Sequence, residues 1–187
     1  YTMKLLRHTL ATTCFSLAIG AALPAFAADS VMVGGAAMYP SKTIVENAVN
    51  SKDHTTLIAA VKAASLVDTL NSKGPFTVFA PTNAAFAALP AGTVESLVKP
   101  ENKATLSNIL TYHVVAGTYT AEDLMMAANK TAGKTMLTTV QGEKLTVTYD
   151  GQMLSLTDSK GSNTAISIAD VMQSNGVIHV IDKVLLP

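Results

Sequence analysis

Histidine is the side chain best suited to acid–base catalysis or metal binding near neutral pH, and this chain carries His54, His113 and His179 beyond its first 27 residues. None of the three has a second histidine or an acid at a spacing such as HExxH, which places two metal ligands and a base on one helix face. His113 and His179 instead lie within apolar segments, where an imidazole usually bonds a backbone group or faces outward from a strand. We therefore predict a structural role for both and no metal site.

The sequence offers no other clear catalytic pattern. No serine lies in a GxSxG motif, which would mark a nucleophile at a strand-to-helix turn. Residues 132–135 are similar to the end of a phosphate-binding loop, but Ala128 stands where the leading glycine belongs, so we predict a turn there. We predict that the protein is not an enzyme and needs no cofactor. A hydrolase is the catalytic alternative, and it would require the fold to bring together paired carboxylates or a histidine-activated serine.

The N-terminus has the pattern of a secretory signal peptide. After the two residues that precede Met3, basic side chains are followed by an apolar stretch centred on residues 15–23 and then by small residues, which predicts cleavage after Ala27. The apolar stretch is interrupted and is shorter than the roughly 20 residues that a membrane helix needs. We therefore set residues 1–27 apart and expect residues 28–187 to be secreted or periplasmic, without a membrane span.

Composition narrows the range of partners. After residue 27 the chain has 11 cations, all of them lysine, against 13 acids. Arginine reads phosphate and guanine through paired hydrogen bonds, so a nearly neutral domain without arginine is unsuited to nucleic acid. The single cysteine, Cys14, lies within the predicted signal peptide. The mature chain therefore has no disulfide, thiol nucleophile or cysteine metal ligand.

The first half of the chain is predicted to be mainly helical. Residues 28–40 show no sustained periodicity and are predicted to be a short leader onto the domain. A capping box at residues 43–46 predicts the start of a helix, and apolar residues at steps of three and four predict another from about 54 to 71. A second capping box, at residues 120–123, introduces a short helix.

Strand patterns dominate the second half. Residues 76–80 are β-branched and aromatic, which predicts a buried strand within the helical half. From residue 134 the apolar period changes to two, with Asp150-Gly151 as a hairpin turn. Asn175-Gly176 introduces a last strand over residues 177–181. Helices followed by antiparallel strands favour an α+β fold over alternating α/β.

Three segments resemble the conserved motifs of fasciclin (FAS1) domains. Residues 74–86 (GPFTVFAPTNAAF) are similar to the first conserved box of that family, and residues 175–185 (NGVIHVIDKVL) are similar to the second. Between them, residues 110–115 (LTYHVV) resemble the family's tyrosine–histidine motif. The motifs occur in the expected order and spacing, and the resemblance covers residues 41–187. One FAS1 domain would therefore account for nearly the whole chain after the leader.

The resemblance implies an α+β FAS1 fold, in which wedge-shaped antiparallel β-sheets have several helices packed around them. It also implies an extracellular or cell-surface adhesion module without catalytic activity, similar to small secreted bacterial members with one domain. In animal members, integrin-binding motifs lie at the tyrosine–histidine segment and just before the second box, commonly as Glu-Pro-Asp-Ile-Met. Here isoleucine and alanine replace the Glu and Pro, and the corresponding binding residues are Tyr112, His113, Asp170, Val171 and Met172.

These observations lead us to expect a binding protein whose partner is a cell-surface or matrix protein or polysaccharide. The segment 170–175 precedes a strand through an Asn-Gly turn and is expected to be a surface loop, where recognition residues concentrate. The alternative is a periplasmic or secreted protein that binds a small ligand or a glycan. That alternative requires a preformed apolar pocket with convergent polar groups.

Overall fold

The structure, a computed structural model, describes residues 30–187. The predicted signal peptide and its cleavage site lie outside these residues. The helices of the described region are α1 (Ile44–Ala48), α2 (Thr55–Ala63), α3 (Val67–Leu70), α4 (Asn83–Ala87), α5 (Thr93–Leu97), α6 (Lys103–Tyr112) and α7 (Ala121–Lys130), with 3₁₀ turns at Lys52–His54 and Pro100–Asn102. The strands are β1 (Val31–Val33), β2 (Ala36–Met38), β3 (Phe76–Pro81), β4 (Val114–Ala116), β5 (Lys134–Thr138), β6 (Lys144–Tyr149), β7 (Leu154–Thr157), β8 (Asn163–Gln173) and β9 (Gly176–Ile181).

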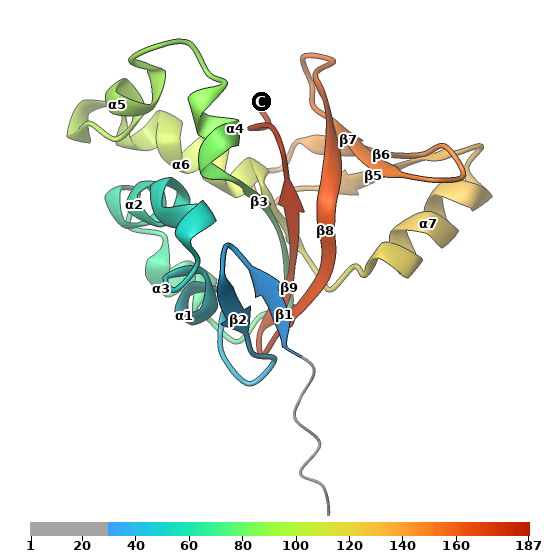
Figure 1. Cartoon of the computed structure of the whole chain (residues 1–187). Coiled ribbons are helices and arrows are strands. Elements are labelled where there is room, and N and C mark those ends of the chain that lie inside the picture. The colour runs from blue at the N-terminus through green and yellow to red at the C-terminus, as the bar shows by residue number, and fades with distance from the viewer. Residues whose placement is uncertain (1–29) are drawn as a thin grey trace, which may run out of the picture.

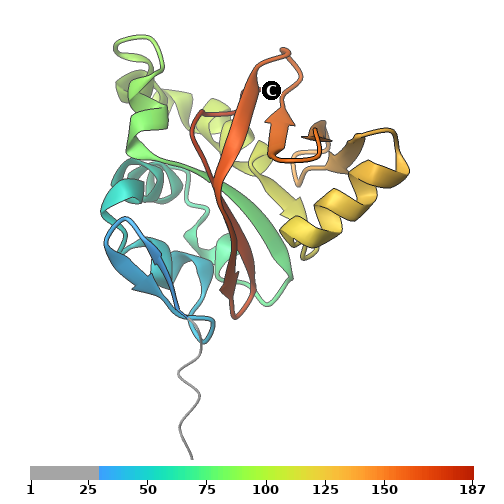
Figure 2. The ribbon, with the colours of Figure 1, turned by 45° about the vertical axis from the view of Figure 1, so that its right-hand side comes forward.

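Strands β3 and β9 form the centre of the molecule. Helices α1 to α6 lie on one side of them, and strands β5 to β7 with helix α7 lie on the other (Figure 1). The turned view shows β8 and β9 running side by side through the middle of the molecule (Figure 2). This arrangement is the predicted α+β fold, with helices packed around the strands.

The main sheet has the strand order β4-β3-β9-β8-β7-β6-β5 within the described region. All neighbouring strands in it are antiparallel except β3 and β9, which run parallel with Phe76 opposite Gly176. The expectation of purely antiparallel sheets is therefore corrected at this central pair. The two ends of the sheet approach each other, because Val115 pairs with Thr139 just beyond β5.

Two hydrophobic cores lie on opposite sides of the central strands. Side chains alternate between the two faces of a strand, so Val78 of β3 packs with the helices α1 to α6 whereas Phe79 packs toward β5 to β7. On β9, Ile178 belongs to the first core and Ile181 to the second. The continuous apolar sequence of β3 and β9 follows from this burial on both faces.

Several predicted local structures are confirmed. Both capping boxes form: Thr43 caps α1 together with Glu46, and Thr120 caps α7 together with Asp123. The predicted buried strand is β3, and the Asp150-Gly151 turn connects β6 to β7. These predictions depend on short sequence patterns, because the hydrogen bonds of a capping box or a tight turn join residues that are close together in the chain.

The single helix predicted over residues 54–71 is wrong, because the chain forms two helices, α2 and α3, with a break between them. Ser65 has a φ of 59°, which is in the left-handed region, and the Leu66 N–H donates to the Val61 carbonyl at 3.0 Å. Leu70 after the break packs in the same core as Val61 before it. The apolar periodicity therefore continues across the break, so the sequence pattern does not show where one helix ends and the next begins.

Part of the predicted leader is folded. Residues 31–38 form the β1–β2 hairpin, whose Val33 and Met38 are buried in the first core. Asn47 of α1 holds the end of this hairpin, because it accepts a hydrogen bond from the Tyr39 N–H and donates one to the Tyr39 carbonyl, at 3.1 and 2.8 Å. The hairpin lies against the short helices at the N-terminal side (Figure 2). The packed structure thus begins ahead of residue 41.

Candidate functional site

The tyrosine–histidine motif lies at the end of α6, in the interior of the protein. The Tyr112 ring is fully buried in the second core, and its hydroxyl donates to the Lys144 carbonyl at 3.2 Å and accepts from the Ser159 N–H at 3.1 Å. Burial raises the pKa of this hydroxyl. Tyr112 therefore connects α6 to β6 and to the turn after β7, and it presents no surface to a partner.

His113 is also an interior residue. One ring nitrogen, Nδ1, lies 2.7 Å from the Ile109 carbonyl, and the other, Nε2, accepts from the Leu185 N–H at 3.0 Å. These partners fix the neutral tautomer that carries its proton on Nδ1. Burial lowers the pKa of His113 to about 4. The predicted structural role for His113 agrees with these contacts, whereas its inclusion among the binding residues does not.

The segment expected to be a surface loop is instead part of a strand. Residues 163–173 form β8, and the pairing of β8 with β9 is irregular between Ile168 and Val171. Asp170 lies in this irregularity with a φ of 57°. Such bulges redirect side chains along a strand, which accounts for the different surroundings of the residues on either side.

Asp170, Val171 and Met172 have three different environments. The Asp170 carboxylate accepts from the Ala121 N–H at 2.6 Å, at the positive end of α7. Val171 is fully buried in the first core. Met172 is 40% exposed. Of the residues that the family resemblance selected, Asp170 and Met172 are exposed, and Met172 is the apolar one of the two.

His179 supports the same bulge from β9. Its Nδ1 accepts from the Asp170 N–H at 3.3 Å, and its Nε2 lies 2.7 Å from the Tyr119 carbonyl, just before α7. The ring stacks on Phe79 with centroids 5.6 Å apart. Burial lowers the pKa of His179 as well. His179 therefore has the structural role predicted for it, holding β8 and the start of α7 together.

Asn175 is a structural residue that the sequence patterns did not identify. Its side-chain oxygen accepts from the Ile44 N–H at 3.1 Å, and its amide group donates to the Leu70 carbonyl at 2.5 Å and to the Ser72 carbonyl at 3.2 Å. The Asn-Gly pair predicts only the turn that joins β8 to β9, since Asn-Gly is a strong turn signal. Its partners are about a hundred residues away in the chain, so no local pattern could show them.

Beside Met172 is a hollow of about 190 Å³ at the turn between β8 and β9. We call this hollow and its rim the β8–β9 surface. Its lining is half polar, and Lys73 provides its charge. The surface is defined by Lys73, Gly74, Pro75, Thr118 and the segment 172–176.

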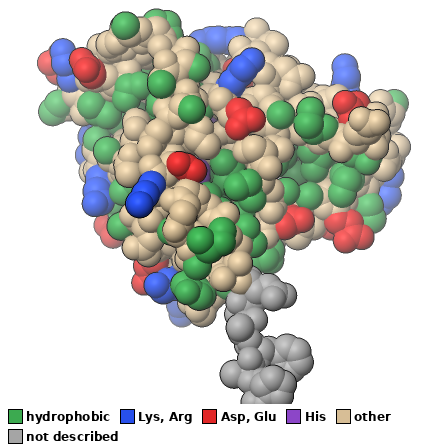
Figure 3. All heavy atoms as spheres, viewed as in Figure 1, with side chains coloured by type: hydrophobic (Ala, Val, Ile, Leu, Met, Phe, Trp, Pro, Cys, Tyr) green, Lys and Arg blue, Asp and Glu red, His purple; other side chains and the backbone are tan. Residues whose placement is uncertain are grey.

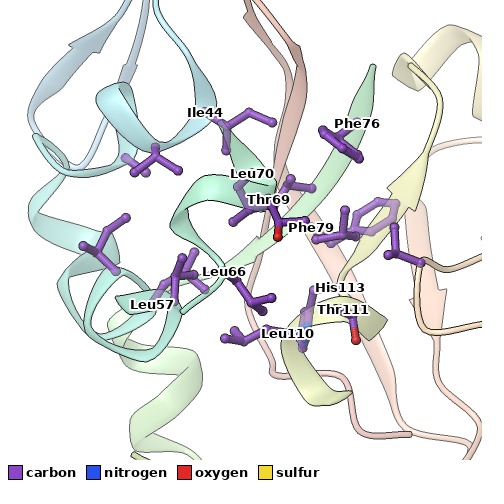
Figure 4. A pocket seen from close by; sticks show the side chains of 17 residues that line it. Ile44, Leu57, Leu66, Thr69, Leu70, Phe76, Phe79, Leu110, Thr111 and His113 are labelled. Atoms are coloured by element: carbon purple, nitrogen blue, oxygen red, sulfur yellow. The ribbon is translucent and has the colours of Figure 1, made fainter. Parts of the chain in front are cut away.

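A second cavity, of about 40 Å³, lies between the helices α1 to α3, helix α6 and strand β3 (Figure 4). Apolar side chains such as Leu57, Leu70 and Leu110 line most of it. The polar residues at its wall include Thr111 and His113, and both ring nitrogens of His113 are already engaged within the protein. Apolar cavities of this kind exclude water and accept small apolar molecules.

A smaller void of about 10 Å³ adjoins this cavity, because Ile44, Ala48 and Leu57 line both. His54 lies at its wall and is almost fully buried. The Nδ1 atom of His54 lies 2.9 Å from the Ser51 hydroxyl, whereas its Nε2 has no hydrogen-bond partner among the described residues. Burial lowers the pKa of His54, so the free Nε2 belongs to a neutral imidazole near pH 7.

Two other kinds of site are absent from residues 30–187. No group of three His, Cys, Asp or Glu side chains in this range could hold a metal ion together. None of the helices in the same range is both long and apolar enough to span a bilayer. Charged side chains of both signs are scattered over the face shown in Figure 3.

Comparisons with known proteins place this geometry in a family. The family model of the fasciclin domain matches residues 52–187. Protein sll1483 of Synechocystis sp. is 52% identical over 159 residues, which cover 84% of this chain and 81% of the relative. The immunogenic protein MPB70 of Mycobacterium bovis is 35% identical over 205 residues, which cover 97% of each chain.

A solved structure has the same fold. The FAS1 domain pair of the insect cell adhesion molecule Fasciclin I superposes with a TM-score of 0.68 at 21% sequence identity, over 78% of this chain and 51% of that one. The fold resemblance agrees with the family match and with the two curated relatives. The chain belongs to the fasciclin (FAS1) domain family.

Proposed function

We propose that this protein is a secreted or periplasmic FAS1 module that attaches to a cell surface or matrix by binding, without catalysis. Membership of the fasciclin family supports a binding role, and the Fasciclin I structure comes from a cell adhesion molecule. His113 and His179 use both ring nitrogens in contacts within the fold, which leaves neither free to act as a base. His54 lies 2.9 Å from the Ser51 hydroxyl, but both side chains are almost fully buried, so a substrate has no access to this pair. The partner is a surface or matrix protein or polysaccharide, and export follows cleavage after Ala27.

The observation that carries this proposal is the exposure of Met172 beside residues that are locked into the framework. Val171 before Met172 and Gln173 after it are both buried, so the backbone that presents Met172 is held on both sides. A rigid, partly exposed apolar side chain loses little entropy when it is buried by a partner. Lys73 on the same surface adds a charge that can orient an acidic partner.

Replacing Met172 with glutamate is expected to reduce attachment without loss of stability. A charge at this position would have to be desolvated against the partner, so we expect retention of the purified protein on cells of its source to fall at least about five-fold. The melting temperature should change by less than about 2 °C, because Met172 is exposed. Retention is measured by washing protein-coated cells and quantifying what remains bound.

Met126 provides the matched control, because it is 48% exposed on α7 and lies outside the β8–β9 surface. Met126→Glu should leave retention unchanged. An Asp170→Asn variant tests whether Asp170 serves only to hold the fold together. Weakening its hydrogen bond to α7 should lower the free energy of unfolding by about 1 kcal/mol. Equal losses of retention for Met126→Glu and Met172→Glu would exclude the β8–β9 surface as the site of attachment.

A second candidate function is the binding of a small apolar molecule, favoured by the cavity under α1 to α3 (Figure 4). Its lining lacks the convergent polar groups that a glycan requires, which argues against a sugar in this position. The cavity volume of about 40 Å³ is well below the roughly 150 Å³ of a cavity that accepts benzene. The class of ligand that fits is therefore an apolar atom or molecule of very small size.

Ala48→Val is expected to abolish binding at this cavity, because Ala48 lines both voids and the added methyl groups would fill them. Xenon under pressure is an apolar probe small enough for a void of about 40 Å³, and it should raise the melting temperature of the unmodified protein by about 1 °C or more, whereas glucose should not. Ala87→Val is the control, since Ala87 is an exposed position of α4. A thermal shift that persists in Ala48→Val would place the probe elsewhere.

A further inference from the structure

The outward face of strands β5 to β7 carries an ordered set of hydroxyl and amino groups. The pairing of β5 with β6 sets Lys134 opposite Thr148, the exposed Met136 opposite Thr146, and Thr138 opposite Lys144. The pairing of β6 with β7 sets Thr146 opposite Thr157 and Thr148 opposite Ser155. Directly paired residues share one side of an antiparallel sheet. We call these residues the lysine–threonine face, defined by Lys134, Lys144, Thr146, Thr148, Ser155 and Thr157.

The opposite face of the same strands is filled by the second core. Leu137, Leu145, Val147 and Leu156 are buried there together with Leu124 of α7. Among residues 30–187, Figure 1 shows α7 on one side of β5 to β7 and no other helix or strand against their opposite side. The lysine–threonine face is therefore an uncovered sheet face, partly or fully exposed at each of its six positions.

This face differs in charge from the rest of the protein. It carries two lysines, and the strand segments 134–138, 144–148, 155–157 and 163–165 contain no Asp or Glu, although acids outnumber lysines after residue 27. Above it lies a hollow of about 510 Å³, lined by threonines of all three strands together with Lys134 and Met136. The side chains of Thr146, Thr148 and Thr157 are half-buried and line this hollow.

The side chains present distinguish among possible partners. Binding to single-stranded nucleic acid relies on aromatic stacking and arginine, and the face has neither. Protein interfaces concentrate their binding energy in Trp, Tyr and Arg, which are also missing from these strand positions. Hydroxyl groups that both donate and accept suit a polyol chain, and lysines at two positions suit carboxylates spaced along it.

We propose that the lysine–threonine face binds an anionic polysaccharide whose sugars carry carboxylates. The lysines would pair with two carboxylates of the chain, and the hydroxyls of β6 and β7 would bond the sugar hydroxyls between them. This inference deepens the proposed binding function by naming one class of partner, and it uses a face other than the β8–β9 surface. Its failure would leave attachment through Met172 unaffected, so the two proposals can be tested separately.

The first test changes the charge of the face. We expect the unmodified protein to bind alginate, a polyuronate, at 150 mM NaCl, and Lys134→Glu with Lys144→Glu to weaken that binding at least about ten-fold. Lys62→Glu with Lys99→Glu is the matched control, because both lysines are exposed on the helical side and give the same change in net charge. The control should stay within about two-fold of the unmodified protein. Thermal melts establish that each variant is folded. If Lys134→Glu with Lys144→Glu unfolds the protein, Lys134→Gln with Lys144→Gln replaces it in the binding measurement.

The second test separates the hydroxyls from the charge. Thr146→Val with Thr148→Val keeps shape and strand propensity while removing two hydroxyls, and it should weaken alginate binding about three-fold or more. Binding of polyacrylate, which has carboxylates but no hydroxyls, should not change. The proposal is overturned if alginate does not bind, if the control lysines matter as much as Lys134 and Lys144, or if the valine variant binds alginate normally.

Discussion

Replacing Gly176 with alanine is expected to unfold the domain or to lower its free energy of unfolding by at least about 4 kcal/mol. Gly176 begins β9 directly beside Phe76 of β3, at the start of the central parallel pair. A Cβ atom there would lie 2.0 Å from the Phe76 carbonyl oxygen and within 3 Å of the Phe76 amide nitrogen. These are backbone atoms of a buried strand, so relief would require the two strands to separate.

Gly74→Ala is the matched control, because it makes the same chemical change near the same phenylalanine. Its Cβ would meet only the end of the Phe76 ring, at 2.9 Å, and that side chain can rotate away. Urea unfolding of both variants gives the comparison. Similar and small losses of stability would show that β3 and β9 do not approach as closely as the structure places them.

Much of the fold could be predicted because the deciding interactions are local. The capping boxes at Thr43 and Thr120, the turn at Asp150 and the buried strand β3 each depend on residues within a few positions of one another. The break at Ser65 could not be predicted, because the residues on both sides face the same core and keep the helical spacing.

The β1–β2 hairpin and the parallel pairing of β3 with β9 depend on distant contacts instead. The hairpin is short, and its fold depends on burying Val33 and Met38 against helices that come later in the chain. A three-residue strand has too few positions to show a period of two. Strand direction likewise follows from the path of the chain between β3 and β9, which no local pattern encodes.

The sequence does not predict which residues of the candidate site are exposed. The family resemblance selected five residues, and the structure buries Tyr112, His113 and Val171 while engaging Asp170 at the start of α7. Only three-dimensional packing shows which side of a bulged strand each side chain occupies. The lysine–threonine face was not identified from sequence, although the alternation over residues 144–149 marks its inner side.

Acidification is expected to destabilise the protein through its buried histidines. An unfolded histidine titrates near pH 6.5, whereas burial lowers the pKa of folded His113 to about 4. Between these values the unfolded state binds a proton that the folded state does not, so the free energy of unfolding falls as the pH falls from 6.5 to about 4. His54 and His179 have lowered pKa values for the same reason and act in the same direction.

The contribution of His113 can be isolated with His113→Gln, which removes the titrating group and retains a donor and an acceptor. At pH 7.5 the variant should be less stable than the unmodified protein by about 1–3 kcal/mol, because the bonds to Ile109 and Leu185 are replaced imperfectly. On moving to pH 4.5 the unmodified protein should lose roughly 2–3 kcal/mol more than the variant, as the lowered pKa requires. Urea unfolding at both pH values measures this difference. The contributions of His54, His179 and the carboxylates are the same in both proteins and therefore cancel. If the two proteins lose stability in parallel, His113 does not take up a proton on unfolding, and its neutral buried state is contradicted.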